Sequence, residues 1–563
     1  MNLKKLVIVG RAGSGKTTTL LKMMESRHPE NTLFLTFTRK ASWEAKERAI
    51  KRWGLEKKEV RYFGTFHKIC YRLLDYSPDM LLKSSEIKEF FDKEKIDFSP
   101  NLYINLEDLE KEEIMPFFGD EAENIPPGNK LLALKSWIEH TRAKSIKDLK
   151  KEEIIKAICE WQTEKNELFN SIFKLSTPES IYNFLMEYED FKGGRADYED
   201  ILLNFLEDPY VPEEIRYLFV DEGQDLSELM KEVVLKILSS GRIEEYFLAG
   251  DDLQRIYAFM GASKYFENEV KDAYKNNYLL YLNKSFRLKK NIWDFYTRFI
   301  LSNINYPQEL LRLECQQGGK VIFPVLMGDY QYFRFFKNFE DKNTFLLTRT
   351  NFLKEEWKRK LRELGIFFLE EGLGENVWTP KMIRIYNALI KLKNNIPIDY
   401  SELLTLIENI YQNPFLYWGI KTKLKKGELK DTLYSFGGEA KYSKEYINKV
   451  FFQKPYNVDY VIKNLPLMLD KKDLKTIEIK LIRNPTLIDT NNCIRIGTIH
   501  SVKGAEADFV ILDARINKRI KEKIFTPEGR IEETAIFGVG ITRAKQELYV
   551  INFEGNPLFS FYL

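Results

Sequence analysis

Residues 6–17 read LVIVGRAGSGKT, in which a short apolar run leads directly into the pattern G-x-x-x-x-G-K-T. The apolar run predicts a buried β-strand, and the residues from Lys16 onward predict a helix. A glycine-rich loop between a strand and a helix can wrap its backbone N–H groups around phosphate oxygens, and the positive end of the helix dipole points at the same anion. The sequence therefore predicts a nucleoside-triphosphate site at this loop.

Two side chains of the loop have expected roles. We expect Lys16 to reach the β- and γ-phosphates of ATP and the Thr17 hydroxyl to bind Mg²⁺. The residues expected to line the nucleotide are Gly10, Arg11, Ala12, Gly13, Ser14, Gly15, Lys16 and Thr17.

A second candidate site follows another apolar run, where residues 217–226 read YLFVDEGQDL. We expect Asp221 to hold Mg²⁺ through water, and Glu222 to orient or deprotonate the attacking water. An Asp-Glu pair alone is more often a surface acidic turn after a strand. The complete pattern D-E-x-Q-D, downstream of a phosphate loop, favours the catalytic interpretation.

Length and composition limit the class of protein. A chain of 563 residues exceeds one hydrophobic core and predicts three or four units. No apolar run approaches the roughly 18 residues that a membrane span needs, and Gly10 and Arg11 interrupt the apolar start, so we expect a cytoplasmic protein without membrane contact. The four cysteines are scattered singly, which argues against a zinc module or a disulfide framework.

Charge is nearly balanced over the whole chain. The 87 basic and 84 acidic residues give a net charge of +3, so overall charge neither demands nor excludes a nucleic-acid partner. Any site for a phosphate backbone must therefore be a local basic groove. The basic stretch at residues 421–430 is a candidate, although a run of charges is usually a solvated face.

Further motifs follow in a fixed order along the chain. They are TFTRKA at 36–41, GTFH at 64–67, DYEDILL at 197–203, GDDLQRIYAFMGA at 250–262, LNKSFRL at 282–288, LLTRTN at 346–351, GTIHSVKGAEAD at 497–508 and ITRAK at 541–545. Together with the phosphate loop and the acidic motif, these resemble the UvrD/Rep/PcrA-like group of superfamily-1A DNA helicases. The resemblance spans nearly the whole chain.

The resemblance implies an α/β fold with two RecA-like P-loop NTPase domains, whose parallel sheets carry helices on both faces. Each domain is expected to contain an inserted, mainly helical subdomain. The expected division is 1–85 and 190–275 for domain 1A with the ATP site, 86–189 for subdomain 1B, 276–395 and 486–563 for domain 2A, and 396–485 for a reduced subdomain 2B.

The resemblance also implies roles for single residues. Gln254 would sense the γ-phosphate, and Arg287 and Arg543 would be arginine fingers that stabilise the transition state. Phe286 would stack on the adenine and Glu506 would hydrogen-bond the ribose. The residues implied to contact DNA are Phe37, Thr65, His67, Tyr257, Phe259 and His500. Taken singly, each arginine is more often a surface charge and each aromatic more often a core residue; the surrounding motifs favour the functional interpretation.

The chain departs from the family pattern at several positions. Met260 stands where the family usually has arginine, Thr534 and Ala535 replace two arginines, and Gly538 and Gly540 replace tyrosine and alanine. The first strand begins close to Met1, so we expect no glutamine-bearing motif that reads adenine. Because Arg543 remains, we expect hydrolysis to survive while its coupling to stepping is loosened.

The expected function is an ATP-dependent DNA helicase or translocase, monomeric, that tracks 3′ to 5′ on single-stranded DNA and acts at single-strand/duplex junctions. Three alternatives stay open. The chain could be a single-strand-stimulated translocase that does not unwind and serves with protein partners in a repair, replication or defence complex. The strand could be RNA, since contacts to phosphates need not distinguish the sugar. A P-loop kinase or nucleotide switch would explain the loop but not the later motifs.

Overall fold

The computed structural model describes residues 3–37, 39–100, 126–164, 177–257, 261–371, 376–426, 434–436 and 439–562. The chain forms two compact units, each built from more than one stretch of the sequence. The first contains Met1–Gly319, Asn517–Thr542 and Pro557–Leu563, and the second contains Lys320–Ile516 and Arg543–Asn556.

The first unit is built on a six-stranded parallel sheet with the strand order β3-β2-β4-β5-β1-β6. Its strands are β1 (Lys4–Gly10), β2 (Thr32–Thr36), β3 (Phe63–Thr65), β4 (Tyr217–Val220), β5 (Glu245–Gly250) and β6 (Leu279–Leu282). The strand that precedes the phosphate loop, β1, therefore lies between β5 and β6, and β4 is on the other side of β5. Because all strands are parallel, the loops that follow β1, β4 and β5 meet at one edge of the sheet.

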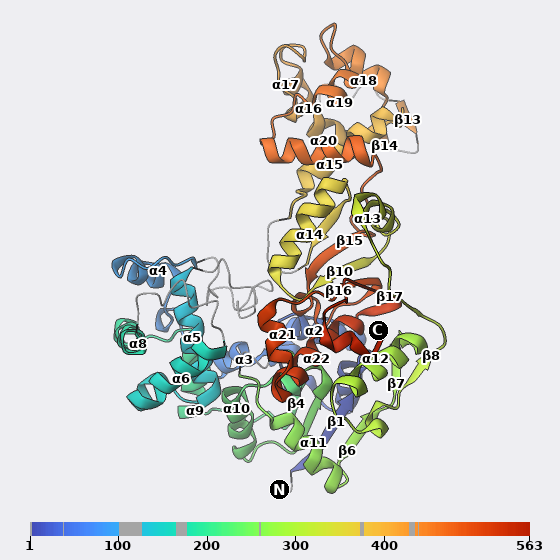
Figure 1. The fold of residues 1–563 in the computed structure, drawn as a ribbon. Helices are drawn as coiled ribbons and strands as arrows, with labels where there is room; N and C mark the ends of the chain where they lie inside the picture. The colour runs from blue at the N-terminus through green and yellow to red at the C-terminus, as the bar shows by residue number, and fades with distance from the viewer. Residues whose placement is uncertain are drawn as a thin grey trace. The chain divides into compact units, whose positions relative to one another are not determined.

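Helices cover both faces of this sheet (Figure 1). The helices of the first unit outside its insertion are α1 (Lys16–Met24), α2 (Arg39–Trp53), α3 (Phe66–Leu73), α9 (Asp200–Glu207), α10 (Glu228–Ser239), α11 (Tyr265–Lys275), α12 (Lys290–Asn303), α21 (Lys518–Ile524) and α22 (Pro527–Ile541). Successive side chains of a strand point to opposite faces. Accordingly, Val7 packs into the core with Val233 of α10, whereas Ile8 packs with Leu20 of α1. The predicted α/β class is confirmed.

The insertion between α3 and α9 is helical. It contains α4 (Ser84–Lys93), α5 (Pro127–Arg142), α6 (Lys151–Glu164) and α8 (Pro178–Lys192). These helices share a separate apolar core in which Phe91, Ile138 and Leu185 are fully buried.

The second unit has its own six-stranded parallel sheet, in the order β11-β15-β10-β16-β17-β9. Its strands are β9 (Lys320–Ile322), β10 (Thr344–Thr348), β11 (Phe368–Glu370), β15 (Ile494–Thr498), β16 (Ala507–Asp513) and β17 (Ala544–Ile551), and its flanking helices are α13 (Gly328–Lys337) and α14 (Asn351–Leu364). Trp357 of α14 packs on this sheet and donates a hydrogen bond of 2.6 Å from Nε1 to Asp513 Oδ2.

A second helical insertion lies between β11 and β15. It contains α15 (Pro380–Lys393), α16 (Tyr400–Asn409), α17 (Ile420–Lys425), α18 (Lys444–Phe451), α19 (Val458–Asn464) and α20 (Lys471–Arg483), with the small sheet β12 (Ile398–Asp399), β14 (Glu439–Tyr442) and β13 (Tyr434–Phe436). Helix α15 contributes Ile385 and Leu389 to the same core as Leu406 of α16 and Val461 of α19. This insertion therefore begins at α15 and not at residue 396 as expected.

The boundary expected after residue 275 also differs from the observed division. β6 pairs with β1, and the two following strands, β7 (Lys284–Lys289) and β8 (Glu314–Gln316), pair with each other, all within the first unit. Helices α21 and α22, expected in domain 2A, fall in the first unit, where α22 packs against α12 and against the 3₁₀ turn Asp252–Gln254 that follows β5. No helix in the described ranges is both long and apolar enough to cross a membrane.

The central position of β1 predicts a stability effect. Ile8 is 0% exposed, so Ile8→Ala should lower the free energy of unfolding of the first unit by about 2–5 kcal/mol, through lost burial and the cavity left behind. Leu235, on the outer side of α10 and 37% exposed, is the matched control, and Leu235→Ala should cost less than about 1 kcal/mol. Urea denaturation of the full-length variants measures both. Equal losses would contradict the placement of β1 in the core.

Candidate functional site

The phosphate loop, residues 11–15, leads from β1 into α1. Gly13 and Gly15 have φ of +70° and +83°, the left-handed region that side chains disfavour. A Cβ atom at Gly10 would lie 2.3 Å from Ser14 Oγ, so the loop closes tightly on the end of the strand. Gly15 caps α1, whose first backbone N–H groups and positive dipole end therefore open on the loop.

Two polar groups of the loop fit an anionic ligand. The Ser14 hydroxyl is buried and makes no hydrogen bond to any residue that the structure describes. Lys16 Nζ folds toward the loop and donates a 3.1 Å hydrogen bond to the Gly10 carbonyl. A backbone cradle with a buried hydroxyl and an ammonium group matches the chemistry of a triphosphate.

Thr17 and Asp221 meet although 204 positions separate them in the sequence. Thr17 Oγ1 donates a 2.5 Å hydrogen bond to Asp221 Oδ2, and the Asp221 backbone N–H bonds to Leu35 on the neighbouring strand β2. Burial and the adjacent Glu222 carboxylate raise the pKa of Asp221 to about 6. A hydroxyl and a carboxylate are oxygen ligands of the kind that Mg²⁺ prefers, so this predicted pair fits the cation.

Glu222 is held beside Asp221 in an unusual conformation. Its φ of +57° is left-handed, which costs roughly 1–2 kcal/mol in a residue other than glycine. Such strain is typical of functional positions. Gln224 Nε2 donates a 2.6 Å hydrogen bond to Glu222 Oε2, so the side chain is also restrained.

Gln254 follows β5 in the 3₁₀ turn η9 (Asp252–Gln254) and is 6% exposed. Its Nε2 donates a 2.7 Å hydrogen bond to Asp251 Oδ2. The Asp251 backbone N–H in turn donates to Gln224 Oε1 at 2.9 Å. The predicted sensor Gln254 and the predicted catalytic base Glu222 therefore share one hydrogen-bond network.

Arg11 behaves differently from its prediction as a nucleotide contact. Its guanidinium is 1% exposed and pairs with Asp251 at 2.6 Å and with Asp252 at 2.7 Å. Burial alone would lower the pKa of Arg11, but the Asp252 and Asp251 carboxylates raise it well above its ordinary value. The side chain is therefore committed to protein carboxylates, which need a positive partner when buried. The sequence offered no signal for this, since Arg11 occupies a variable position of the loop pattern.

Strand β7 brings Phe286 and Arg287 to the phosphate loop within the first unit. The Phe286 backbone N–H donates to the Gly13 carbonyl at 2.9 Å, and a Cβ atom at Gly13 would lie 2.3 Å from Arg287 Cβ. The Phe286 ring is 69% exposed and lies against Gly15. A flat apolar surface beside the phosphate loop is suited to stacking on a base.

The second unit holds Arg543, Glu506 and His500. Arg543 and Glu506 directly precede Ala544 and Ala507, which pair in the parallel strands β17 and β16. Arg543 is 1% exposed and donates from Nη1 to the Ala505 carbonyl at 3.2 Å, whereas Glu506 is exposed and lies 3.7 Å from Lys545 Nζ. His500 is half-buried and begins the 3₁₀ turn η13 (His500–Val502).

The residues predicted to contact DNA divide into groups. Phe37 is half-buried, and its ring centroid lies 5.0 Å from that of Tyr257. Tyr257, Thr65 and His67 are buried within the first unit. Phe259 and the departure Met260 lie outside the described residues.

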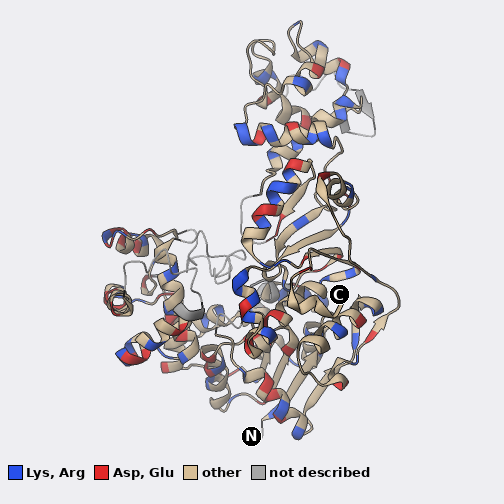
Figure 2. Ribbon diagram, in the orientation of Figure 1, with Lys and Arg blue, Asp and Glu red and all other residues tan. Residues whose placement is uncertain are grey.

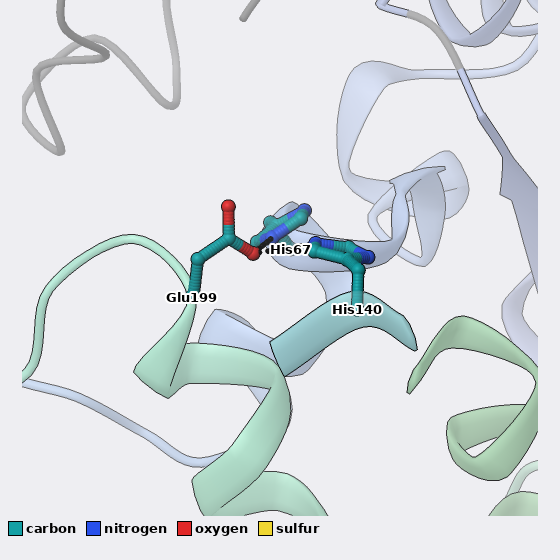
Figure 3. Close-up of side chains that lie close together, drawn as sticks. All are labelled: His67, His140 and Glu199. Carbon is teal, nitrogen blue, oxygen red and sulfur yellow. Dashed lines mark hydrogen bonds and ion pairs between the residues drawn. The ribbon is translucent and has the colours of Figure 1, made fainter. Parts of the chain in front are cut away.

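The burial of His67 has a specific cause (Figure 3). Glu199 Oε2 lies 3.2 Å from His67 Nε2 and 2.6 Å from His140 Nε2, so one carboxylate oxygen joins two imidazoles. Burial alone would raise the pKa of Glu199, but His140 and His67 hold it well below its ordinary value. Histidine and glutamate also bind transition metals. Here the two imidazoles and the carboxylate hydrogen-bond directly to one another. These bonds join α3, α5 and the segment that enters α9.

Charged residues of both signs are interspersed over the described helices (Figure 2). Four of the described helices, α1, α3, α15 and α17, carry basic but no acidic residues; the sequence of α17, at the start of the predicted basic stretch, is IKTKLK. Part of its charge is used internally, because Lys421 Nζ bonds to the Glu408 carbonyl at 2.9 Å. The rest of the basic stretch, from residue 427, lies outside the described residues.

Comparison with known proteins agrees with this geometry. The UvrD/REP helicase N-terminal domain matches residues 2–275, and the UvrD-like helicase C-terminal domain matches residues 458–555. A DNA helicase II homolog of Mycoplasma genitalium is 24% identical over 97% of this chain and 82% of its own length. The ATP-dependent DNA helicase Rep of Buchnera aphidicola subsp. Baizongia pistaciae is 22% identical over 97% of this chain and 88% of its own length. The ATP-dependent DNA helicase PcrA of Bacillus subtilis is 22% identical over 98% and 81%, respectively. The chain belongs to the UvrD-like helicase family.

Proposed function

We propose that this chain is an ATP-dependent DNA helicase that moves 3′ to 5′ on single-stranded DNA and acts at single-strand/duplex junctions. The observation that supports it most directly is the meeting of Lys16, Thr17, Asp221, Glu222 and Gln254 at the carboxyl edge of the first sheet. The relatives at 22–24% identity are named DNA helicases, which supports the choice of substrate.

At the ATP site, the backbone of the phosphate loop and Lys16 bind the phosphates. Glu222 orients the attacking water and accepts its proton, and Gln254 senses the γ-phosphate. Mg²⁺, held by Thr17 and Asp221, would neutralise phosphate charge when it is bound. Phe286 stacks on the base, and Glu506 hydrogen-bonds the ribose.

In the proposed cycle, ATP binding closes the two RecA-like domains on each other and release reopens them. Arg287 from β7 and Arg543 from the second unit supply positive charge to the transition state. The monomer grips DNA through contacts that include Phe37, Phe259 and His500, which suit a sequence-tolerant motor.

A second candidate function is translocation without unwinding, as a subunit of a repair, replication or defence complex. The sequence of α22 favours this candidate. Thr534 and Ala535 stand there at two positions that carry arginine in the family pattern, and both are buried. A forked duplex that stays paired, while the chain displaces a protein bound to single-stranded DNA, would select this candidate. Unwinding only of forks with a 3′ tail would select the leading proposal.

The first test is ATP hydrolysis with and without single-stranded DNA. Single-stranded DNA should stimulate the unaltered chain. Glu222→Gln should lower kcat by at least about 100-fold, because the amide cannot accept a proton from water. Binding of a fluorescent ATP analogue should stay within about threefold, since the amide still accepts the Gln224 hydrogen bond. Hydrolysis indifferent to single-stranded DNA, or unaffected by the substitution, would contradict the proposal.

The phosphate loop can be tested through Gly13. Gly13→Ala should reduce ATP affinity by at least about tenfold, because the new Cβ would displace either the loop or Arg287. Gly241 is the matched control: its φ of +71° imposes the same backbone strain, but a Cβ there meets nothing within 4 Å. Gly241→Ala should affect stability alone. Isothermal titration with ATP measures the difference, and similar affinities for the two variants would argue against the assigned loop geometry.

Base stacking is tested by Phe286→Ala, with Tyr274→Ala as control. Both rings are exposed, at 69% and 74%, but Tyr274 lies on α11 and outside the proposed site. We expect Phe286→Ala to raise KM for ATP about 5- to 50-fold, on the scale of one aromatic–base stack, and Tyr274→Ala to leave it unchanged. Steady-state kinetics at saturating DNA checks this. An unchanged KM for Phe286→Ala would remove Phe286 from the site.

A further inference from the structure

The Arg11 guanidinium, at the carboxyl edge of the first sheet, is buried and bound by four partners. Besides its two carboxylate partners, its Nη2 donates to Tyr306 Oη at 2.5 Å and its Nε to the Leu310 carbonyl at 3.2 Å. Tyr306 Oη also donates to Asp252 Oδ2 at 2.7 Å. One side chain of the phosphate loop thus ties together η9 and the segment that follows α12.

Of the two carboxylates that Arg11 binds, Asp251 is shut off from water and Asp252 is partly exposed. Asp251 is 1% exposed and the Asp252 side chain 22% exposed. In the described part of the chain, Arg11 is the one residue that forms an ion pair with either of them. Without it, the fold would hold an uncompensated buried charge next to the ATP site.

Asp251 connects this ion pair to both predicted catalytic side chains. Its Oδ1 binds Arg11, its Oδ2 accepts the hydrogen bond of Gln254, and its backbone N–H binds Gln224, which restrains Glu222. A displacement of Asp251 would therefore move both side chains together.

Helix α22 explains why the charge comes from the loop. It packs against η9, and its buried residues include no lysine or arginine. Thr534 and Ala535 stand where the family pattern has arginines, and a Cβ at Gly538 would meet the Tyr296 ring at 2.9 Å. This side of η9 therefore receives no positive charge from α22.

We propose that Arg11 is a positioning residue for ATP hydrolysis, which places Gln254 and Glu222 through Asp251 and takes over the charge that α22 lacks. The inference rests on the proposed function. It assigns Arg11 no contact with the nucleotide, so its loss should affect kcat more than ATP binding.

The test compares Arg11→Lys with Arg27→Lys. Arg27 lies in the same unit and is 17% exposed; it pairs with Glu245 at the opposite end of β5, away from the ATP site. Lysine keeps the charge but loses the planar fork that binds two carboxylates and Tyr306 at once. We expect Arg11→Lys to lower the DNA-stimulated kcat about tenfold or more, because small displacements of catalytic groups have large effects on rate. Affinity for a fluorescent ATP analogue should stay within about threefold, and Arg27→Lys should stay within about twofold in both measurements.

Two further variants keep the test decisive. Tyr306→Phe removes one hydroxyl without changing charge, so it should fold, and it should lower kcat severalfold with little change in KM. In a Gln254→Ala background, Arg11→Lys should cause a smaller fold-loss than in the unaltered chain, because the two act along one path.

Each outcome is informative. A kcat within twofold of the unaltered chain for both Arg11→Lys and Tyr306→Phe would overturn the positioning role. Equal fold-losses of Arg11→Lys in both backgrounds would overturn the path through Gln254. Loss of nucleotide binding in parallel with kcat would make Arg11 a structural residue of the loop. No ATP hydrolysis by the unaltered chain would instead overturn the proposed function, and this inference with it.

Discussion

Buried negative charge at the carboxyl edge of the first sheet is the constraint on which the rest of the site depends. Asp221 and Asp251, each 1% exposed, directly follow the parallel strands β4 and β5, and Glu222 adds a third carboxylate beside them. Carboxylates this deeply buried are stable only when each has a hydrogen-bond donor or a cation. Thr17 at the start of α1, Gln224 in the turn after β4 and Arg11 in the phosphate loop supply these partners. The arrangement that stabilises the edge is therefore the one that places the reactive groups.

The first helical insertion is attached to its sheet by polar contacts of the same kind. Lys135 on α5 is 1% exposed and forms ion pairs with Glu139, Glu189 and Asp197. Glu199 hydrogen-bonds to His67 and His140. His140 also forms a 2.7 Å hydrogen bond with Ser227, at the start of α10. Hydrogen bonds have a preferred direction, so these contacts specify one orientation of α5 on α3 and α9. Apolar packing alone would specify this orientation less strictly. The motif histidine His67 is thus held by packing and hydrogen bonding.

Much of the site could be predicted from short stretches of sequence. The phosphate loop with the start of α1, the acidic turn after β4 and the segment after β5 each follow an apolar strand and carry polar residues. Parallel strands must bring such ends to one edge of the sheet. Domain limits could not be predicted so well. β6 lies in the first unit because it pairs with β1, and α22 lies there because it packs against η9; α15 lies in the second insertion because it packs against α16. Those partners are far away in the sequence, and periodicity carries no information about them.

The sequence by itself determined the order of the motifs and which residues are candidates for phosphate binding, cation binding and catalysis. Local patterns suffice for this because a strand, a tight turn and a helix start depend on neighbouring residues. Only the tertiary structure decided that Arg11 forms ion pairs with Asp251 and Asp252 and that His67 hydrogen-bonds to Glu199. Both are buried charged or polar groups whose partners come from other loops, and the need to compensate a buried charge has no counterpart in local sequence.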